Sequence, residues 1–196
     1  MPTPGNVDFG ELIARLARAL ADRELPFMLI GGQAVLLHGE PRLTQDVDVT
    51  LGVSPARLND ALAACHAARL SPLPADVAGF VRDTFVLPAA DRSTGIRVDL
   101  VFSTTPYEAE AIRRAVLVNV GGERVPFASA EDLILHKLFA GRPRDLEDAA
   151  GVVRRKGREL DWAYIHGWAA EFSVVAGRES LPEQARALER ETGREG

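Results

Sequence analysis

The order of the hydrophobic patterns along this chain limits its possible folds more than any other feature. Up to about residue 128, short apolar runs alternate with segments whose apolar residues recur at helical spacing, and from residue 129 onward every patterned segment is helical. The apolar runs predict strands at residues 26–31, 47–53, 84–89, 95–102, 116–120 and 124–128. The helical spacing predicts helices at residues 7–24, 33–39, 56–70, 107–115, 129–141, 144–157, 161–173 and 181–193.

This order predicts an α/β (α+β) fold in which helices flank a mixed sheet. We expect an α/β core at residues 1–128 and a C-terminal helical lobe at residues 129–196, which can pack with the core as one domain. Two hairpins are expected, one around the turn DRSTG and one around GGE. Ser54 and Ser129 are expected to cap the helices that follow them.

Composition excludes several classes of protein. The chain has 196 residues, 46% of them hydrophobic, and no apolar run approaches the roughly 20 residues that a bilayer crossing needs. The first residues lack a basic region followed by an apolar stretch, so we expect no secretory signal. The single cysteine, Cys65, excludes an intrachain disulfide and a cysteine-rich zinc site. We therefore predict a cytoplasmic protein without a membrane partner.

Charge is spread unevenly along the chain. The net charge is −5; residues 1–136 hold 12 basic and 17 acidic side chains, and residues 137–196 hold 11 of each, in agreement with the totals of 23 and 28. The excess of acidic side chains in residues 1–136 is compatible with a metal-binding site in that part of the chain. The densest basic run, RRKGR at residues 154–158, is a candidate for contact with an RNA backbone, although such a run is more commonly a solvated helix end.

Three aspartates suggest a metal site. Val47 and Val49 flank Asp48 in an apolar run, so Asp46 and Asp48 are predicted to lie on one face of a strand. Two like charges placed side by side repel, which indicates that a cation belongs between them. Asp99, in the apolar run IRVDLVF, could add a third carboxylate from an adjacent strand. Such an oxygen-ligand site suits Mg²⁺ and, with one or two ions, the transfer of phosphoryl groups.

Gly31 and Gly32 follow the first predicted strand. Without side chains, their backbone could approach a triphosphate at the N-terminus of the helix that begins near Gln33. With these glycines included, the chain resembles the nucleotidyltransferase superfamily related to DNA polymerase β. The resemblance consists of Ile30-Gly31-Gly32, thirteen intervening residues, Asp46-Val47-Asp48 and, later, Asp99.

This resemblance implies a minimal nucleotidyltransferase fold and assigns roles to the matched residues. Asp46, Asp48 and Asp99 would be catalytic and would bind Mg²⁺, and Asp99 could help to deprotonate the attacking hydroxyl. Gly31 and Gly32 would hold the triphosphate of an NTP substrate. In-line attack on the α-phosphorus would then release pyrophosphate.

A second stretch resembles a narrower family. Residues 129–149, SAEDLILHKLFAGRPRDLEDA, are similar to the downstream motif of the AbiEii-like and MenT-like toxins, in which a lysine precedes Arg-Asp-x-x-Asp. Lys137 falls beside Leu133, Ile134 and Leu138 on an apolar helix face, where a lysine either extends to solvent or meets an anion. The resemblance makes Lys137 catalytic and a ligand of the nucleotide phosphates.

Further residues of this motif, and of the loop before the first aspartate, are candidates for nucleotide binding. Asp145 and Asp148 would line the nucleotide site or orient Lys137, and the sequence does not distinguish between them; alternatively they form a surface ion-pair helix start, with Arg144 reaching Asp148. Arg42 and Thr44 match the loop before the first catalytic aspartate and are expected to bind nucleotide. Thr44 is also a candidate for regulatory phosphorylation by a kinase-like antitoxin, since a phosphate there would oppose triphosphate binding.

The resemblance implies the toxin of a bacterial toxin–antitoxin system. Such a toxin would add NMP from an NTP to the 3′ end of tRNA, block translation and have a cognate antitoxin protein as its partner. The alternatives are adenylylation of a partner protein, modification of a small molecule such as an aminoglycoside, and a degenerate, purely binding domain. We expect the four histidines and the aromatic residues Trp162, Tyr164 and Trp168 to be structural.

Overall fold

The computed structural model describes residues 9–192. Its helices are α1 (Phe9–Ala21), α2 (Gly31–His38), α3 (Leu58–Ala67), α4 (Val77–Thr84), α5 (Pro106–Arg114), α6 (Ala130–Ala140), α7 (Pro143–Lys156), α8 (Trp162–Phe172) and α9 (Leu181–Thr192), with 3-10 turns η1 (Pro55–Arg57) and η2 (Gly157–Glu159). Its strands are β1 (Phe27–Ile30), β2 (Asp46–Leu51), β3 (Leu70–Pro72), β4 (Val86–Asp91), β5 (Arg97–Phe102), β6 (Val116–Val120) and β7 (Glu123–Phe127).

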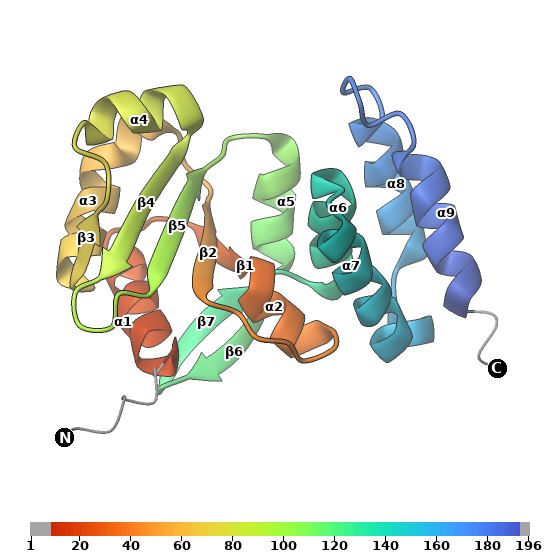
Figure 1. The fold of residues 1–196 in the computed structure, drawn as a ribbon, viewed down its shortest axis with the longest axis horizontal. Helices are drawn as coiled ribbons and strands as arrows, with labels where there is room; N and C mark the ends of the chain where they lie inside the picture. Colours follow the sequence, from red (N-terminus) through yellow and green to blue (C-terminus); the bar gives the residue numbers. More distant parts are fainter. Residues whose placement is uncertain (1–8, 193–196) are drawn as a thin grey trace. The chain divides into compact units, whose positions relative to one another are not determined.

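The seven strands form one mixed sheet in the order β3-β4-β5-β2-β1-β7-β6 (Figure 1). Strand β2 is parallel to β5, and β1 is parallel to β7, while the pairs β3–β4, β4–β5 and β6–β7 are antiparallel. Both predicted hairpins are therefore confirmed. Strand β2, which carries Asp46 and Asp48, is the central strand of the sheet.

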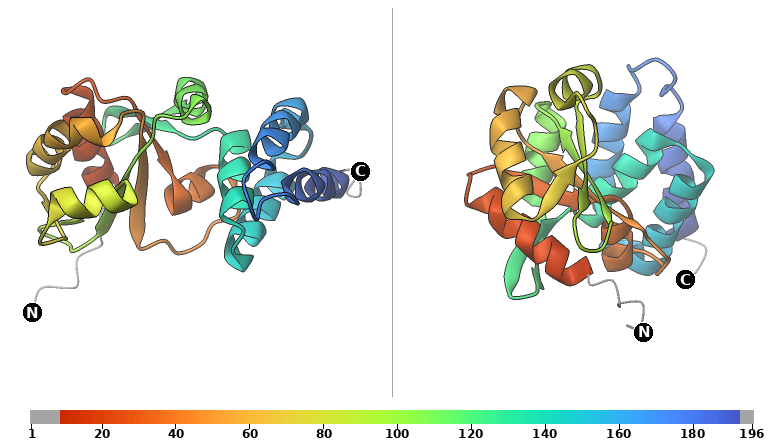
Figure 2. Two further views of the ribbon diagram at one scale, coloured as in Figure 1. Left: turned by 90° about the horizontal axis from the view of Figure 1, so that it is seen from above. Right: turned by 60° about the vertical axis from the view of Figure 1, so that its left-hand side comes forward.

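The chain forms two compact units, which are described separately. The first consists of the residues up to Leu29 together with Gln45–Phe127, and it holds most of the sheet. Helix α1 presents Leu12, Leu16 and Leu20 as a fully buried stripe, as its spacing predicts. It packs against α3, β6 and β7 (Figures 1 and 2).

The second unit consists of Ile30–Thr44 together with the residues from Ala128 onward. Helix α6 packs against α7 and α8, α8 packs against α9, and α2 contacts α6 and α7. Ser129 caps α6 by accepting a hydrogen bond of 3.1 Å from the Asp132 amide, as expected from the sequence. The chain segment between β1 and β2 thus belongs, by its contacts, with the C-terminal helices.

The structure adds two elements that the sequence analysis missed, the short strand β3 and the helix α4. Helix α1 ends at Ala21, three residues before the predicted end. Residues 7–8 and 193, at the ends of two predicted helices, lie outside the described residues. Between residues 9 and 192, no helix combines the length and apolar character that a membrane crossing requires.

Candidate functional site

The three aspartates lie together on adjacent parallel strands of the first unit. Asp48 and Asp99 are direct register partners, and Asp46 pairs in register with Arg97. Val47 and Val49 are completely buried, whereas Asp46 and Asp48 are half-buried, as alternation along a strand requires. Because neighbouring strands lie about 4.8 Å apart and side chains alternate along each strand, the three carboxylates are neighbours on one face of the sheet.

Arg97 is a member of this cluster that the sequence analysis missed. Its Nε donates to both carboxylate oxygens of Asp99 at 3.0 Å, although the arginine side chain is 55% exposed. The hydrogen bond and charge of Asp99, with smaller effects of Asp46 and Asp48, raise the pKa of Arg97. The guanidinium therefore partly neutralises the charge that the three aspartates concentrate at this place.

The donor set of this cluster fits Mg²⁺. Three carboxylates offer the hard oxygen ligands that this ion prefers, and their half-exposure leaves room for waters and phosphates. Within residues 9–192, no group of three or more histidine, cysteine or acidic side chains is already arranged around a common metal position. Since both Asp99 oxygens face Arg97, metal binding requires Asp99 to share its carboxylate or to turn from the guanidinium.

In the second unit, α2 begins with the predicted glycine pair. Gly31 has a φ of +64°, a left-handed conformation that favours glycine. A Cβ added to Gly32 would lie 2.2 Å from Thr44 Oγ1 and 2.7 Å from Thr44 Cβ. The Thr44 side chain therefore rests directly on the Gly32 backbone, and any larger residue at position 32 would displace it.

Lys137 lies in a buried charge cluster of the second unit. Its Nζ is 2.8 Å from Asp145 Oδ1 and 2.9 Å from Asp148 Oδ2, and its side chain is only 9% exposed. Arg42 binds Asp148 through both nitrogens of its fork, at 2.7 and 2.9 Å, and Arg142 binds Asp145 at 2.5 Å. Burial opposes ionisation of both aspartates, but the arginine and lysine hydrogen bonds hold their pKa values below the ordinary value.

The structure thus divides the predicted site residues between two clusters. Asp46, Asp48 and Asp99 meet in the first unit. Gly32 and Thr44 meet in the second unit, where Lys137, Asp145, Asp148 and Arg42 form the charge cluster. In this structure Lys137 Nζ contacts carboxylates, and its contact with phosphate stays a prediction. Asp148 takes its guanidinium from Arg42, 106 residues away, and not from Arg144, the partner in the alternative surface ion pair.

The basic run at residues 154–158 is partly used within the protein. Arg154 forms a bidentate ion pair with Glu40, and Arg155 donates to the carbonyl of Gly39. Among the histidines, His38 bonds the Ala128 carbonyl at 2.8 Å, and burial lowers the pKa of His136 to about 4. Tyr164 donates to the buried Asp132 at 2.7 Å. These contacts give His38 and Tyr164 structural roles.

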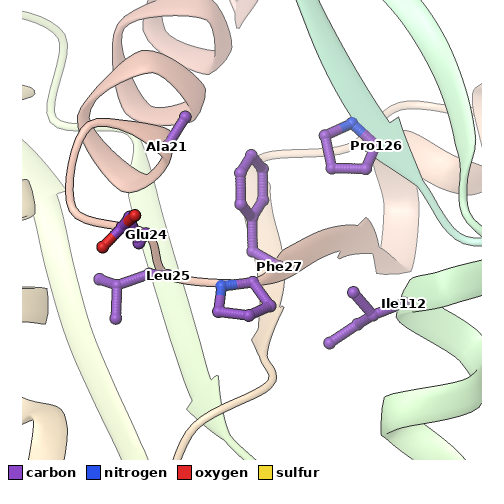
Figure 3. Close-up of a pocket in the computed structure, with 7 residues that line it drawn as sticks. Ala21, Glu24, Leu25, Phe27, Ile112 and Pro126 are labelled. Atoms are coloured by element: carbon purple, nitrogen blue, oxygen red, sulfur yellow. The ribbon is translucent and has the colours of Figure 1, made fainter.

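The first unit also contains a cavity of about 470 Å³ that none of the predicted site residues lines (Figure 3). Its lining residues are Ala21, Glu24, Leu25, Pro26, Phe27, Ile112 and Pro126. The lining is apolar apart from Glu24 and offers no cationic side chain to a phosphate. We therefore assign the candidate site to the carboxylate cluster and not to this cavity.

Comparison with known proteins identifies the family of the chain. The family model for a nucleotidyltransferase of unknown function (DUF6036) matches residues 9–180. None of the curated proteins matches the chain significantly in sequence.

Several solved structures share the fold. An antigenic nucleotidyltransferase-like protein from Paracoccidioides brasiliensis is 17% identical with a TM-score of 0.55, over 76% of this chain and 77% of its own. ANT(2")-Ia in complex with adenylyl-2"-tobramycin is 18% identical with a TM-score of 0.54, over 91% and 97% of the two chains. A candidate nucleotidyltransferase from H. pylori is 15% identical with a TM-score of 0.50, over 98% and 99%. The expected nucleotidyltransferase fold is confirmed.

Proposed function

The chain belongs to the nucleotidyltransferase family DUF6036, and from this premise we propose that it transfers NMP from a Mg²⁺-bound NTP to a hydroxyl acceptor, with release of pyrophosphate. The observation that carries the proposal is the register pairing of Asp48 with Asp99, with Asp46 two residues away on the same strand face. The resemblance to the DNA polymerase β-related superfamily implies three carboxylates at one place, and in this chain they lie on two neighbouring strands.

Each group has a defined task in the proposed reaction. Asp46, Asp48 and Asp99 hold the Mg²⁺, which when bound polarises the α-phosphate and the leaving oxygen. Asp99 is the third ligand and accepts the proton of the attacking hydroxyl. Gly31 and Gly32 bind the triphosphate through backbone amides at the start of α2, where the helix dipole favours an anion. Arg42 and Thr44 contribute to nucleotide binding.

We propose the 3′ end of tRNA as the acceptor and the toxin of a bacterial toxin–antitoxin pair as the biological role. Support comes from the resemblance of residues 129–149 to the AbiEii-like and MenT-like motif, whose Lys137, Asp145 and Asp148 lie in mutual contact. Arg142, at the start of α7, and Arg158, in the turn η2, have exposed side chains that an RNA backbone could contact, and Arg142 also pairs with Asp145. A cytoplasmic location and a cognate antitoxin protein belong to the same proposal.

A cationic small molecule is the second candidate acceptor. The observation in its favour is the net charge of −5, with 17 acidic and 12 basic side chains in residues 1–136. An acidic surface attracts polycations and repels RNA. The complex of ANT(2")-Ia with adenylyl-2"-tobramycin shows that the same fold accommodates such an acceptor. Adenylylation of a partner protein is the third possibility.

Phosphorylation of Thr44 is the proposed regulatory step. Its hydroxyl lies directly against Gly32, the glycine proposed to bind the triphosphate. A phosphate on that oxygen would add about −2 charge there and would repel the nucleotide. Mass spectrometry of the protein after co-expression with the product of the neighbouring gene tests this step. Unmodified Thr44 in a fully inhibited protein would contradict it.

The acceptor is identified as the molecule that receives the ³²P label from the NTP. Purified protein is incubated with Mg²⁺, each α-³²P-labelled NTP in turn, and either total bacterial tRNA, an aminoglycoside panel or a bacterial protein extract. The matched controls are Asp46→Ala and Asp99→Asn, which remove a metal ligand. We expect label on tRNA that both variants abolish. Label on the aminoglycoside or on protein alone would replace the tRNA proposal with the corresponding alternative, and label that persists in both variants would overturn the carboxylate site.

A further inference from the structure

The loop between α2 and β2 is attached to one helix at several successive points. We call residues 39–44 the strap; it contains no helix or strand. The carbonyl of Gly39 accepts a hydrogen bond of 2.8 Å from Arg155, and Glu40 pairs with Arg154 at 2.8 and 2.9 Å. The carbonyl of Leu43 receives a longer contact of 3.5 Å from Arg144. All three arginines belong to α7.

These attachments follow one face of α7. Arg144, Asp148, Gly151 and Arg155 are spaced by four, three and four residues, which places them in one row on a helix. Their partners in the strap run in the opposite order, so the strap lies antiparallel to α7. A Cβ at Gly151 would lie 3.5 Å from Glu40, which shows that the strap comes within van der Waals range of the helix.

The central attachment is much less exposed than the others. Arg42 binds Asp148 through two parallel hydrogen bonds, and the side chain of Asp148 is 5% exposed, compared with 41% for Arg154 in its pair with Glu40. Lys137 Nζ lies 2.9 Å from Asp148 Oδ2, the oxygen that also accepts the Nη2 hydrogen bond of Arg42. Charge-assisted bidentate pairs are strong when screened from water, whereas exposed pairs contribute little. Asp148, held by Lys137, is therefore the main anchor of the strap.

We propose that Lys137 and Asp148 are positioning residues that act through Arg42. By fixing Arg42 they hold the strap on α7, and the strap ends at Thr44, whose side chain rests on Gly32. The nucleotide-binding turn is thereby formed before the nucleotide arrives, which lowers the ordering cost of binding. This inference rests on the proposed function. It replaces direct phosphate contact as the task of Lys137.

Asp148→Asn separates positioning from a direct effect of charge. If the cluster acted only through its charge, removal of a negative charge would strengthen the binding of an anionic nucleotide. If the cluster positions the strap, the same substitution weakens the bond to Arg42 and therefore weakens nucleotide binding. For the isosteric change Asp148→Asn, positioning therefore predicts weaker nucleotide binding, whereas a direct charge effect predicts stronger binding. Asp145→Asn is the matched comparison, because Asp145 also binds Lys137 and lies in α7 but contacts Arg142 instead of the strap.

The experiment combines hydrogen exchange of the nucleotide-free protein with steady-state kinetics. In Asp148→Asn and Arg42→Met we expect the strap amides, which every strap residue except Pro41 carries, to exchange about tenfold faster or more, in line with loss of a charge-assisted pair. The KM for NTP should rise by a similar factor with kcat changed less than about threefold. Asp145→Asn should have a smaller effect on exchange. Lys137→Arg should keep the strap attached, whereas Lys137→Met should release it.

Arg186→Met, which removes a cation paired with Glu183 in α9, is the control for loss of a positive charge from the same unit, and it should leave strap exchange and kinetics unchanged. Unchanged exchange in Asp148→Asn, or a lowered KM, would overturn the proposal. Arg42 is partly exposed, so Arg42→Met provides a folded variant even where Lys137→Met destabilises the protein. If the wild-type protein transfers no nucleotide, the exchange rates of the strap amides still show whether Asp148 and Arg42 hold the strap on α7. Failure of the proposed function is therefore distinguishable from failure of this inference.

Discussion

For single residues of the candidate site, the sequence predicts which strand face they occupy but not which distant residues they contact. The face shared by Asp46 and Asp48 follows from strand alternation alone, and the structure confirms that they are half-buried beside fully buried valines. Position 32 requires a glycine because the side chain of Thr44, twelve residues along the chain, lies against its backbone. No pattern in the sequence near residue 32 predicts this contact.

Substitution of Gly32 tests this contact. We expect Gly32→Ala to lower the free energy of unfolding by about 1–3 kcal/mol, because its Cβ must displace Thr44. Gly167→Ala is the matched control, since no atom lies within 4 Å of the added Cβ in α8, and it should stabilise the protein by about 0.5–1 kcal/mol. Denaturant unfolding of both variants measures the difference. Equal stability of the two variants would show that the Thr44 contact is unimportant.

Arg97 should compete with metal for Asp99. We expect Arg97→Met to increase the affinity for Mn²⁺ about three- to tenfold, because a positive charge bonded to Asp99 opposes a second cation. Arg113→Met, which removes an arginine from an ion pair with Glu110, should leave this affinity unchanged. Electron paramagnetic resonance of free Mn²⁺ provides the measurement without need for activity. Weaker binding in Arg97→Met would mean that the guanidinium helps the metal site.

The elements were predictable where they are long and strongly patterned. Strands β1, β2, β5 and β7 and helices α6 to α9 occupy the expected regions. Strand β3 has only three residues and includes Pro72, so it has no period to detect, and it exists through pairing with β4. Helix α4 contains Gly79 and is capped by Asp76, features that individually suggest a turn.

The junction of α6 and α8 gives an element-level prediction. Asp132, at the start of α6, is fully buried and accepts hydrogen bonds of 2.7 Å from both Ser129 and Tyr164. Tyr164→Phe removes a hydrogen bond to a fully buried carboxylate, so we expect a loss of about 1–3 kcal/mol in unfolding free energy. In the background of Asp132→Ala the same substitution should cost much less. An equal cost in both backgrounds would exclude this hydrogen bond as a stabilising contact.

At the scale of the molecule, the sequence suggested a boundary near residue 128, and the chain's contacts place residues 30–44 with the C-terminal helices. Local patterns cannot anticipate this grouping, because it depends on pairs such as Arg42 with Asp148 and Arg154 with Glu40, more than 100 residues apart. The same limitation hides the buried ion pairs of Lys137 from the sequence. Its two carboxylate partners become evident only when α6 and α7 are packed together.

Stability at low pH should depend on Asp91 in the first unit. Burial opposes its ionisation, but hydrogen bonds from Ser93 and Thr94 outweigh burial and lower the pKa of Asp91 from 3.8 to about 2. A carboxyl with a lowered folded-state pKa stabilises the fold above pH 3.8, and this contribution is lost as the pH falls toward 2. It amounts to about 2 kcal/mol.

We therefore expect Asp91→Asn to be less stable than the wild type at pH 7 and to approach it as the pH falls below 4. Urea unfolding at a series of pH values compares the two proteins. A stability difference that stays constant from pH 7 to pH 2 would contradict the assignment.

Nucleotidyl transfer at the carboxylate cluster is tested most directly by identifying the phosphate ion that the reaction releases from the NTP. Wild-type protein and Asp48→Asn are incubated with Mg²⁺, γ-³²P-labelled NTP and the acceptor fraction, and the released label is separated into pyrophosphate and orthophosphate. We predict label in pyrophosphate, released by the wild type and abolished by Asp48→Asn, because Asp48 and its register partner Asp99 are the proposed ligands of the metal. Label in orthophosphate, or pyrophosphate release that survives Asp48→Asn, would contradict nucleotidyl transfer at this site.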